Sequence, residues 1–438
     1  NDLTDRNARN SMMRKSTYVF PNSESRRPVR ADVWTVRKIA SEKRPEPSCS
    51  REAGSPPLQG PAYDGMPSRA ASSGPFRIRC GIRVVTRDIL SSLNGTGVFY
   101  YNGKISRGDG DGDWDVRLAD VSEAYEKLKG RVHRTPLLFS RTFSNMSGCD
   151  IYLKLENLQK TGSFKVRGAL SKIIRLSAEK RVNGVVAASA GNHAQGVALA
   201  ANEAGTSAII VMPETAPEAK VRATEAYGAE VVLYGRHFDE SYEKAVELAE
   251  SRGASLVHAF DDPDVIAGQG TIGLELIEQL PDVEAVIVPV GGGGLASGIG
   301  VAIKNVRPHV RVIGVQPETA NSVYLSWRTG AFHSVTAPRS VADGLIVKQP
   351  GRLTLELMRK YVDDMVTVSE SEILNAMFYF LERAKLLVEG AGAVTLAAML
   401  SGKTGLNGRK TVLIVSGGNV DLRKWTRFAA PAAAGSPR

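Results

Sequence analysis

From about residue 114 onward, short apolar runs alternate with stretches in which apolar residues recur every three or four positions. Unbroken apolar runs are typical of strands buried on both faces, and the recurring pattern is typical of amphipathic helices. Strands are predicted over residues 151–156, 185–188, 208–212, 230–233, 256–258, 285–290, 310–315 and 412–415. Helices are predicted between them, for example over 166–176 and 192–204. This alternation predicts an α/β fold built on mostly parallel sheets flanked by helices.

The first helix of this region is defined by signals at its two ends. Asp120 and Glu123 have the spacing of a capping box, in which two side chains satisfy free backbone N–H groups at a helix start. Gly130 is suited to the left-handed conformation that often ends a helix. The sequence therefore predicts a helix that begins next to Asp120 and ends before Gly130.

Residues 1–113 have a different texture, with proline, serine and arginine scattered without apolar periodicity. Such a stretch buries too little apolar surface to offset the entropy of ordering, so we predict a low-complexity, disordered extension. Within it, Asn102-Gly103 between apolar residues predicts a small hairpin over 98–105. Residues 426–438, rich in alanine and proline, are predicted to form a disordered tail.

Composition excludes several classes of protein. The net charge of +10 is concentrated in residues 1–113, which carry +7 of it, and no aromatic-interleaved basic stripe accompanies it, so nucleic acid is not an expected partner. No apolar run is long enough to cross a membrane. Three scattered cysteines give neither a disulfide framework nor a zinc cluster. We therefore expect a cytoplasmic protein.

A candidate nucleophile stands in the turn over 161–169. Lys165 directly follows Phe164, between Gly162 and Gly168, where a helix is predicted to begin. A lysine enclosed by apolar groups loses solvation and tends toward the neutral amine, which can attack a carbonyl and form a Schiff base. Most lysines are solvated surface charges, so a functional role for Lys165 is predicted only together with three partner motifs elsewhere in the chain.

The first partner follows the predicted strand 185–188. Ser189, Ala190, Gly191, Asn192 and His193 open a helix. The free N–H groups and the positive dipole end of such a helix can bind an anion such as a substrate carboxylate, although serine or asparagine is also common there as a simple cap.

The second partner follows the predicted strand 285–290, where the chain reads Gly291, Gly292, Gly293, Gly294 and Leu295. Consecutive glycines provide no packing, and their expected use is close approach of the backbone to a phosphate. Gly291, Gly293 and Ala296 also partly match the dinucleotide fingerprint, with Glu318 as a possible ribose ligand. An NAD-dependent dehydrogenase is therefore an alternative, weakened by the long spacing to Glu318.

The third partner is Ser416, which follows the predicted strand 412–415 and precedes two glycines. Its hydroxyl could meet a flat heteroaromatic ligand, or it could belong to a polar turn. A lysine for an aldehyde, glycines for a phosphate, a hydroxyl for a ring nitrogen and an anion loop for a carboxylate together match pyridoxal 5'-phosphate. A dinucleotide leaves Lys165 and Ser416 unexplained.

With these motifs in place, the region from about residue 118 to 422 resembles the fold-type-II pyridoxal phosphate enzymes, and most closely the short, catabolic-type threonine dehydratases and serine racemase. The matching segments are 134–137 (RTPL), 162–169 (GSFKVRGA), 189–196 (SAGNHAQG), 291–295 (GGGGL), 342–344 (ADG) and 416–419 (SGGN). The resemblance implies two open, mostly parallel sheets, as in the tryptophan synthase β chain. It also implies a large cofactor-binding domain over 114–183 and 262–425, a small domain over 184–261, and a dimer or tetramer.

The resemblance also implies the roles of the site residues. Lys165 would carry the cofactor and later take the substrate α-proton, and Asn192 would bond the cofactor's 3′-oxygen. The backbone of 291–295 would hold the phosphate, Ser416 would meet the pyridine nitrogen, and 189–193 would bind the substrate carboxylate. The expected reaction is loss of water from L-threonine or L-serine, followed by hydrolysis to a 2-oxo acid and ammonia.

Two positions distinguish reactions on this scaffold. Serine racemases usually have a second serine where this chain has Ala190, and alanine cannot transfer a proton, so dehydration is expected rather than racemisation. Gln316 and Ser322 stand where racemase-like enzymes place carboxylates for a divalent cation, so no metal site is expected. Serine racemase, 3-hydroxyaspartate dehydratase and a non-enzymatic binding module are the remaining alternatives.

Overall fold

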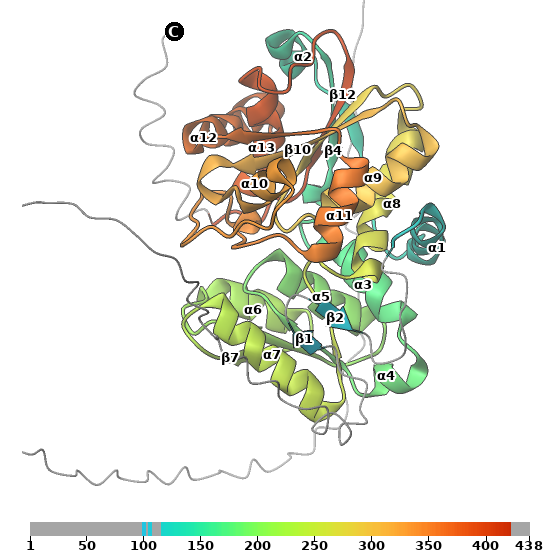
Figure 1. Cartoon of the computed structure of the whole chain (residues 1–438), viewed down its shortest axis with the longest axis vertical. Coiled ribbons are helices and arrows are strands. Elements are labelled where there is room, and N and C mark those ends of the chain that lie inside the picture. Colours follow the sequence, from blue (N-terminus) through green and yellow to red (C-terminus); the bar gives the residue numbers. More distant parts are fainter. Residues whose placement is uncertain (1–98, 102–103, 107–114, 422–438) are drawn as a thin grey trace, which may run out of the picture. The chain divides into compact units, whose positions relative to one another are not determined.

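The computed structural model describes residues 99–101, 104–106 and 115–421 (Figure 1). Its larger sheet has six strands in the order β11-β10-β9-β12-β4-β3. All neighbours are parallel except β3 and β4. The strands are β3 (Leu137–Phe139), β4 (Asp150–Leu155), β9 (Ala285–Pro289), β10 (Arg311–Pro317), β11 (Asp364–Val368) and β12 (Lys410–Val415).

The smaller sheet has four strands in the order β7-β6-β5-β8, and every pair is parallel. These strands are β5 (Val185–Ala188), β6 (Ala208–Met212), β7 (Glu230–Leu233) and β8 (Ser255–Leu256). Together the two sheets confirm the predicted α/β class with mostly parallel strands.

Helices follow most of the strands and cover the sheets. They are α1 (Leu118–Leu128), α2 (Arg141–Ser147), α3 (Lys165–Arg175), α4 (Ala178–Val182), α5 (Asn192–Glu203), α6 (Glu218–Ala226), α7 (Phe238–Arg252), α8 (Pro263–Gln279), α9 (Gly294–Val306), α10 (Ser322–Thr329), α11 (Arg352–Tyr361), α12 (Glu370–Tyr379) and α13 (Gly390–Leu400). Successive strand residues point to opposite faces, so in β9 Ile287 packs in the same core as residues of α12 and α13, while Val286 and Val288 pack with α8 and α9. Figure 1 shows these two helix groups on opposite sides of the larger sheet.

The structure corrects the predicted start of the first helix. Helix α1 begins at Leu118, with Arg117 as its N-cap, because the Arg117 N–H donates to the Asp120 carboxylate at 2.9 Å. Asp120 is therefore the third residue of the helix and not its cap. Glu123, freed from a capping role, pairs with Arg175 of α3.

Two strands were not predicted, and both lie at the edges of the larger sheet. β3 is antiparallel and exposes Leu138 and Phe139, while β11 carries Asp364 and Thr367 among its apolar residues. Edge strands are covered less completely, so they lack the unbroken apolar pattern of the central strands.

The remaining predictions concern the segments outside the two sheets and the division into domains. The predicted Asn-Gly hairpin is confirmed, since β1 (Phe99–Tyr101) and β2 (Lys104–Ser106) pair as antiparallel strands. The rest of 1–113 and the tail 426–438 lie outside the described residues. The division into a large domain, over 114–183 and 262–425, and a small domain, over 184–261, stays a prediction. Within the described ranges, no helix combines the length and apolarity needed to cross a bilayer.

Candidate active site

The predicted site residues meet at the carboxyl ends of strands from both sheets. A cavity of about 1450 Å³ is lined there by Lys165, 189–193, 291–295 and Ser416. β5, β9 and β12 end at its edge, which is where parallel sheets bind ligands. The four motifs, spread over more than half of the chain, thus share one cavity.

Lys165 begins α3 and is mostly buried in the wall of this cavity. Its ammonium donates to the Ala259 carbonyl at 2.8 Å and lies 5.3 Å from the centre of the Phe164 ring. Burial lowers the pKa of Lys165 to about 8, while the nearby Glu389 opposes this shift. A substantial fraction of the amine is therefore neutral near physiological pH, as a carbonyl-binding lysine requires.

The turn that carries Lys165 is bonded to the turn that carries Ser416. The Phe164 N–H donates to the Ser416 carbonyl at 3.2 Å, and the Gly418 N–H donates to the Gly162 carbonyl at 2.9 Å. The Asn419 amide adds a bond to the Thr161 carbonyl at 2.8 Å. These bonds fix the distance between a lysine and a hydroxyl that lie 251 positions apart in the chain.

Close helix packing holds α3 near the glycine loop. A Cβ at Gly168 of α3 would lie 2.3 Å from the Gln269 side chain of α8, and one at Gly268 would lie 2.6 Å from the Arg167 carbonyl. A Cβ at Gly298 of α9 would lie 2.3 Å from the Ile266 carbonyl. Because these positions lack side chains, α3, α8 and α9 approach closely, and the starts of α3 and α9 reach the same cavity.

The loop 291–295 fits a phosphate group. Gly293 has φ +100°, and the first bond within α9 runs from the Ser297 N–H to the Gly293 carbonyl at 2.8 Å. The N–H groups of Gly294, Leu295 and Ala296 therefore have no acceptor in the helix and remain for an anion at its positive end. A Cβ at Gly292 would overlap the Phe260 ring at 2.3 Å, so the loop has no room for side chains. Together with the partly neutral amine of Lys165 and the Ser416 hydroxyl, this loop suits pyridoxal phosphate.

We expect Gly293→Ala to weaken cofactor binding at least tenfold. The substitution forces a left-handed conformation on alanine, at about 1–2 kcal/mol, and its Cβ would lie 2.6 Å from the Met358 methyl. Gly402→Ala is the matched control, because Gly402 has φ +71° with nothing within 4 Å of a Cβ. Cofactor titration of the apoproteins should show a loss for Gly293→Ala alone. Equal affinities for both variants would exclude a phosphate-holding role for the loop.

The loop 189–193 lines the cavity and leads into α5, whose first N–H groups have no acceptor within the helix. Ser189 Oγ accepts from the Gly191 N–H at 3.1 Å and keeps its own hydrogen to donate. His193 is 3% exposed, and its Nε2 lies 2.9 Å from the Val257 carbonyl. Burial and the nearby Lys165 lower the pKa of His193 to about 3, so the ring is uncharged. Any attraction of this loop for a carboxylate therefore comes from N–H and O–H groups and not from an imidazolium.

The sequence did not point to Glu389, which also lines the cavity. Its Oε1 accepts from the Asn192 amide at 2.7 Å. The signal that could have found it is an acidic residue directly before 390–392 (GAG), at the start of the otherwise apolar α13. His258 also lines the cavity, and its Nδ1 accepts from the Asp261 N–H at 2.8 Å.

A buried ionic cluster stands behind Lys165 on α3. Arg167, two positions further along, is fully buried and pairs with Glu156 at 2.8 Å and with Glu275 at 2.7 Å. Lys154 pairs with Glu275 at 2.5 Å, also without solvent contact. The two cations and two carboxylates balance, and Thr135 adds a bond to Glu156. This cluster joins α3 to β4 and α8.

The residues named for other functions have structural roles here. Glu318 is exposed, pairs with Lys403 at 3.2 Å and does not line the cavity. The role of ribose ligand, which the NAD-dependent dehydrogenase alternative assigned to Glu318, is therefore wrong. Gln316 accepts from the Tyr324 N–H at 2.8 Å, and Ser322 donates to the Val347 carbonyl at 3.2 Å. Among the described residues, no group of three or more His, Cys, Asp or Glu side chains is arranged to hold a metal.

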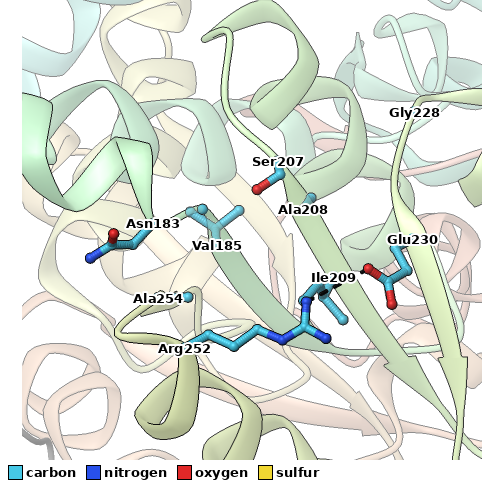
Figure 2. Close-up of a pocket in the computed structure, with 10 residues that line it drawn as sticks. Asn183, Val185, Ser207, Ala208, Ile209, Gly228, Glu230, Arg252 and Ala254 are labelled. Atoms are coloured by element: carbon cyan, nitrogen blue, oxygen red, sulfur yellow. Dashed lines mark ion pairs between the residues drawn. The ribbon is translucent and has the colours of Figure 1, made fainter.

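A second cavity, of about 240 Å³, opens at the amino ends of β5, β6 and β7 (Figure 2). Its charged side chains, Arg252 and Glu230, face each other at 3.8 Å. None of the predicted site residues lines it, and active sites of parallel sheets lie at the opposite, carboxyl ends.

Comparison with known proteins identifies the class to which this fold and site belong. Residues 128–418 match the family described as pyridoxal-phosphate dependent enzyme, and the chain belongs to that family. Its cofactor is pyridoxal phosphate, as the site motifs predicted.

Individual relatives are named for particular enzyme activities. An L-threonine ammonia-lyase of Thermotoga maritima is 56% identical over 313 residues, which is 72% of this chain and 78% of that protein. The catabolic L-threonine dehydratase TdcB of Escherichia coli K12 is 48% identical over 314 residues, 71% of this chain and 95% of that protein. The structure of maize serine racemase superimposes with a TM-score of 0.69 at 36% identity, covering 73% of this chain and 98% of that one.

Proposed function

We propose that this protein is a threonine ammonia-lyase that also accepts serine, and that it forms 2-oxobutanoate or pyruvate together with ammonia. The observation that carries the proposal is the cavity in which Lys165, the glycine loop and Ser416 face an anion-binding helix start. Two relatives named for threonine ammonia-lyase or dehydratase activity, at 48% and 56% identity, support the same substrate class. Bound pyridoxal phosphate supplies an electron-withdrawing ring that stabilises negative charge at the substrate α-carbon.

The chain's own residues have distinct roles in this proposal. Lys165 would hold the cofactor in the resting enzyme, and its free amine would accept the α-proton of the substrate; its pKa of about 8 leaves part of that amine neutral. The N–H groups of 291–295 would hold the phosphate, and the Ser416 hydroxyl would bind the ring nitrogen. The loop 189–193 would orient the substrate carboxylate, while Asn192 would bind the cofactor's 3′-oxygen. Because the Ser416 hydroxyl is neutral, it would not hold a proton on the ring nitrogen as a carboxylate would, and this favours elimination of water.

The assay that tests the function follows 2-oxo acid formation from L-threonine, L-serine and threo-3-hydroxyaspartate, with D-serine monitored in parallel. We expect 2-oxobutanoate from L-threonine, slower or comparable formation of pyruvate from L-serine, and no competing D-serine. Threonine and serine differ by one methyl group, for which a pocket discriminates by only about 1–3 kcal/mol, so both should react. D-serine that forms faster than pyruvate would instead favour the racemase alternative. Turnover of threo-3-hydroxyaspartate without turnover of L-threonine or L-serine would favour the 3-hydroxyaspartate dehydratase alternative.

The racemase alternative makes a prediction at Ala190. Ala190→Ser places a hydroxyl on the loop that binds the substrate, where a proton could be delivered to the face opposite Lys165. We expect D-serine formation from L-serine to rise by roughly tenfold or more, a modest share of what a placed acid can contribute. Chiral chromatography of the products measures it, with Ala204→Ser, at the end of α5, as the control. An unchanged rate of D-serine formation would show that Ala190 does not determine whether the enzyme eliminates water or racemises its substrate.

Assembly and location complete the proposal. The partner is a small amino-acid substrate, and we propose a dimer or tetramer of this chain in the cytoplasm. Sedimentation of the purified holoenzyme tests the assembly directly, and a monomer at micromolar concentration would contradict it.

A further inference from the structure

Glu389 is a carboxyl group in the cofactor cavity for which the proposed reaction has no use. It precedes α13, is 6% exposed, and accepts from the Asn192 amide at 2.7 Å. Gly417 makes this contact possible, since a Cβ there would lie 2.2 Å from the carboxyl oxygen and 3.2 Å from the Asn192 nitrogen.

The Asn192 amide is fixed from both ends. Its oxygen accepts from the Asn419 amide at 2.9 Å, and its nitrogen donates one of two hydrogens to Glu389. These two bonds set which end of the amide is oxygen and which is nitrogen, and leave one N–H uncommitted. Asn192 lines the cavity, so this N–H is the one that remains for an acceptor on the cofactor.

Burial, more than the charges around it, disfavours the ionised form of Glu389. Asp343, in the short turn Asp343–Leu345, is a carboxylate that interacts with Glu389, and its own partner is Lys220 of α6 at 3.1 Å. Lys165 is the other cation in the cavity that interacts with Glu389. Among the described residues, no lysine or arginine forms an ion pair with the Glu389 carboxyl. Burial, with a smaller contribution from Asp343, raises the pKa of Glu389 to about 8, although the Asn192 amide, the charge of Lys220 and a backbone hydrogen bond from Asn419 oppose this shift.

We propose that Glu389 is a positioning residue of the cofactor site, which directs the free N–H of Asn192 toward the cofactor and does so as an uncharged acid. The proposal rests on the family's cofactor and not on the identity of the amino-acid substrate. A neutral acid accepts the Asn192 hydrogen without placing a full negative charge beside the cofactor's ring oxygen. Loss of the proton brings that charge into a poorly solvated cavity, where it is only weakly screened.

The sign of the pH effect follows from the raised pKa. Below about pH 8 the acid is protonated and the cofactor's ring oxygen faces a neutral neighbour. Above it, the carboxylate repels the negative charge on the same oxygen, so the visible spectrum of the bound cofactor should change and its affinity should fall. Asp343→Asn removes a negative neighbour and should move the midpoint to lower pH.

The test is a pH titration of the visible absorption of the holoenzyme, together with cofactor affinity of the apoprotein at pH 7 and pH 9. Wild type should show a transition near pH 8. Glu389→Gln, which keeps the acceptor but has no proton to lose, should abolish the transition and should bind the cofactor more tightly than wild type at pH 9 but equally at pH 7. Glu389→Ala, which releases Asn192, should lower the affinity about tenfold or more at both, the equivalent of one lost hydrogen bond to a well-ordered group.

Several outcomes would overturn the proposal. A transition that persists unchanged in Glu389→Gln belongs to another group, and a wild type without any transition leaves Glu389 charged or uninvolved. If Glu389→Gln does not fold, the midpoint in Asp343→Asn decides, since an unshifted midpoint excludes Glu389. Each of these spectroscopic expectations can prove wrong while threonine turnover is normal, so this proposal and the proposed function are tested separately.

Discussion

Replacing Lys165 with alanine should abolish both the visible absorption band of the bound cofactor and the formation of 2-oxo acid. The amine is the only group in the 161–169 turn able to form a Schiff base with an aldehyde, and its lowered pKa of about 8 makes it reactive near neutral pH. The same amine is the proposed acceptor of the substrate α-proton. Loss of both roles should reduce turnover by roughly 10³-fold or more, and added external amines should restore little of it.

The control for this variant is Lys160→Ala, five positions earlier. Lys160 forms a partly exposed ion pair with Glu203 at 2.6 Å, outside the cavity lining. We expect it to keep the band and most of the turnover. Absorption spectra and 2-oxo acid assays of the two variants, each with a circular dichroism spectrum to verify folding, make the comparison. A folded Lys165→Ala protein that retains the band would remove Lys165 from the site.

Replacing Arg167 with methionine should produce the largest loss of stability among single substitutions in the site region. Arg167 is fully buried between Glu156 and Glu275, and methionine fills similar space without charge. The two carboxylates would then share only Lys154, and breaking a buried pair from one side costs about 3–5 kcal/mol. The damage should extend to cofactor binding, because Arg167 and Lys165 lie on the same turn of α3.

Urea unfolding of the apoprotein measures this loss directly. Arg222→Met is the matched control, since Arg222 pairs with Glu218 on the surface of α6, with both side chains more than two-thirds exposed. Exposed pairs of this kind contribute about 0–1 kcal/mol. An Arg167→Met protein as stable as the control would mean that the cluster is neutral in energy and serves only to choose the packing of α3.

The central strands and the four site motifs were accessible from the sequence because each carries a local signal. β5 and β6, which lie inside the smaller sheet, agree with the predicted ranges to the residue, as does its edge strand β7, since their apolar runs are bounded by polar turns. Lys165, 291–295 and Ser416 each follow such a strand, and parallel topology brings strand ends together. The edge strands β3 and β11 lack that signal, and the start of α1 depended on a backbone contact of Arg117 that residue type does not reveal.

Glu389 could not be found by the same reasoning. The role of Glu389 depends on its contact with Asn192 and on the close approach of the Gly417 backbone, and these three residues come from separate parts of the chain. An acid before a helix start is ordinarily a capping or dipole-compensating residue. Only the closed arrangement of α5, α13 and the turn after β12 shows it buried beside the cofactor site.

The most direct test of the account is reduction of the holoenzyme with borohydride, followed by peptide mass spectrometry. Reduction converts the linkage between lysine and the cofactor aldehyde into a stable secondary amine, so the modified residue can be read from the peptide that carries it. We expect a single phosphopyridoxyl group on Lys165. Modification of another lysine, or of none, would contradict it.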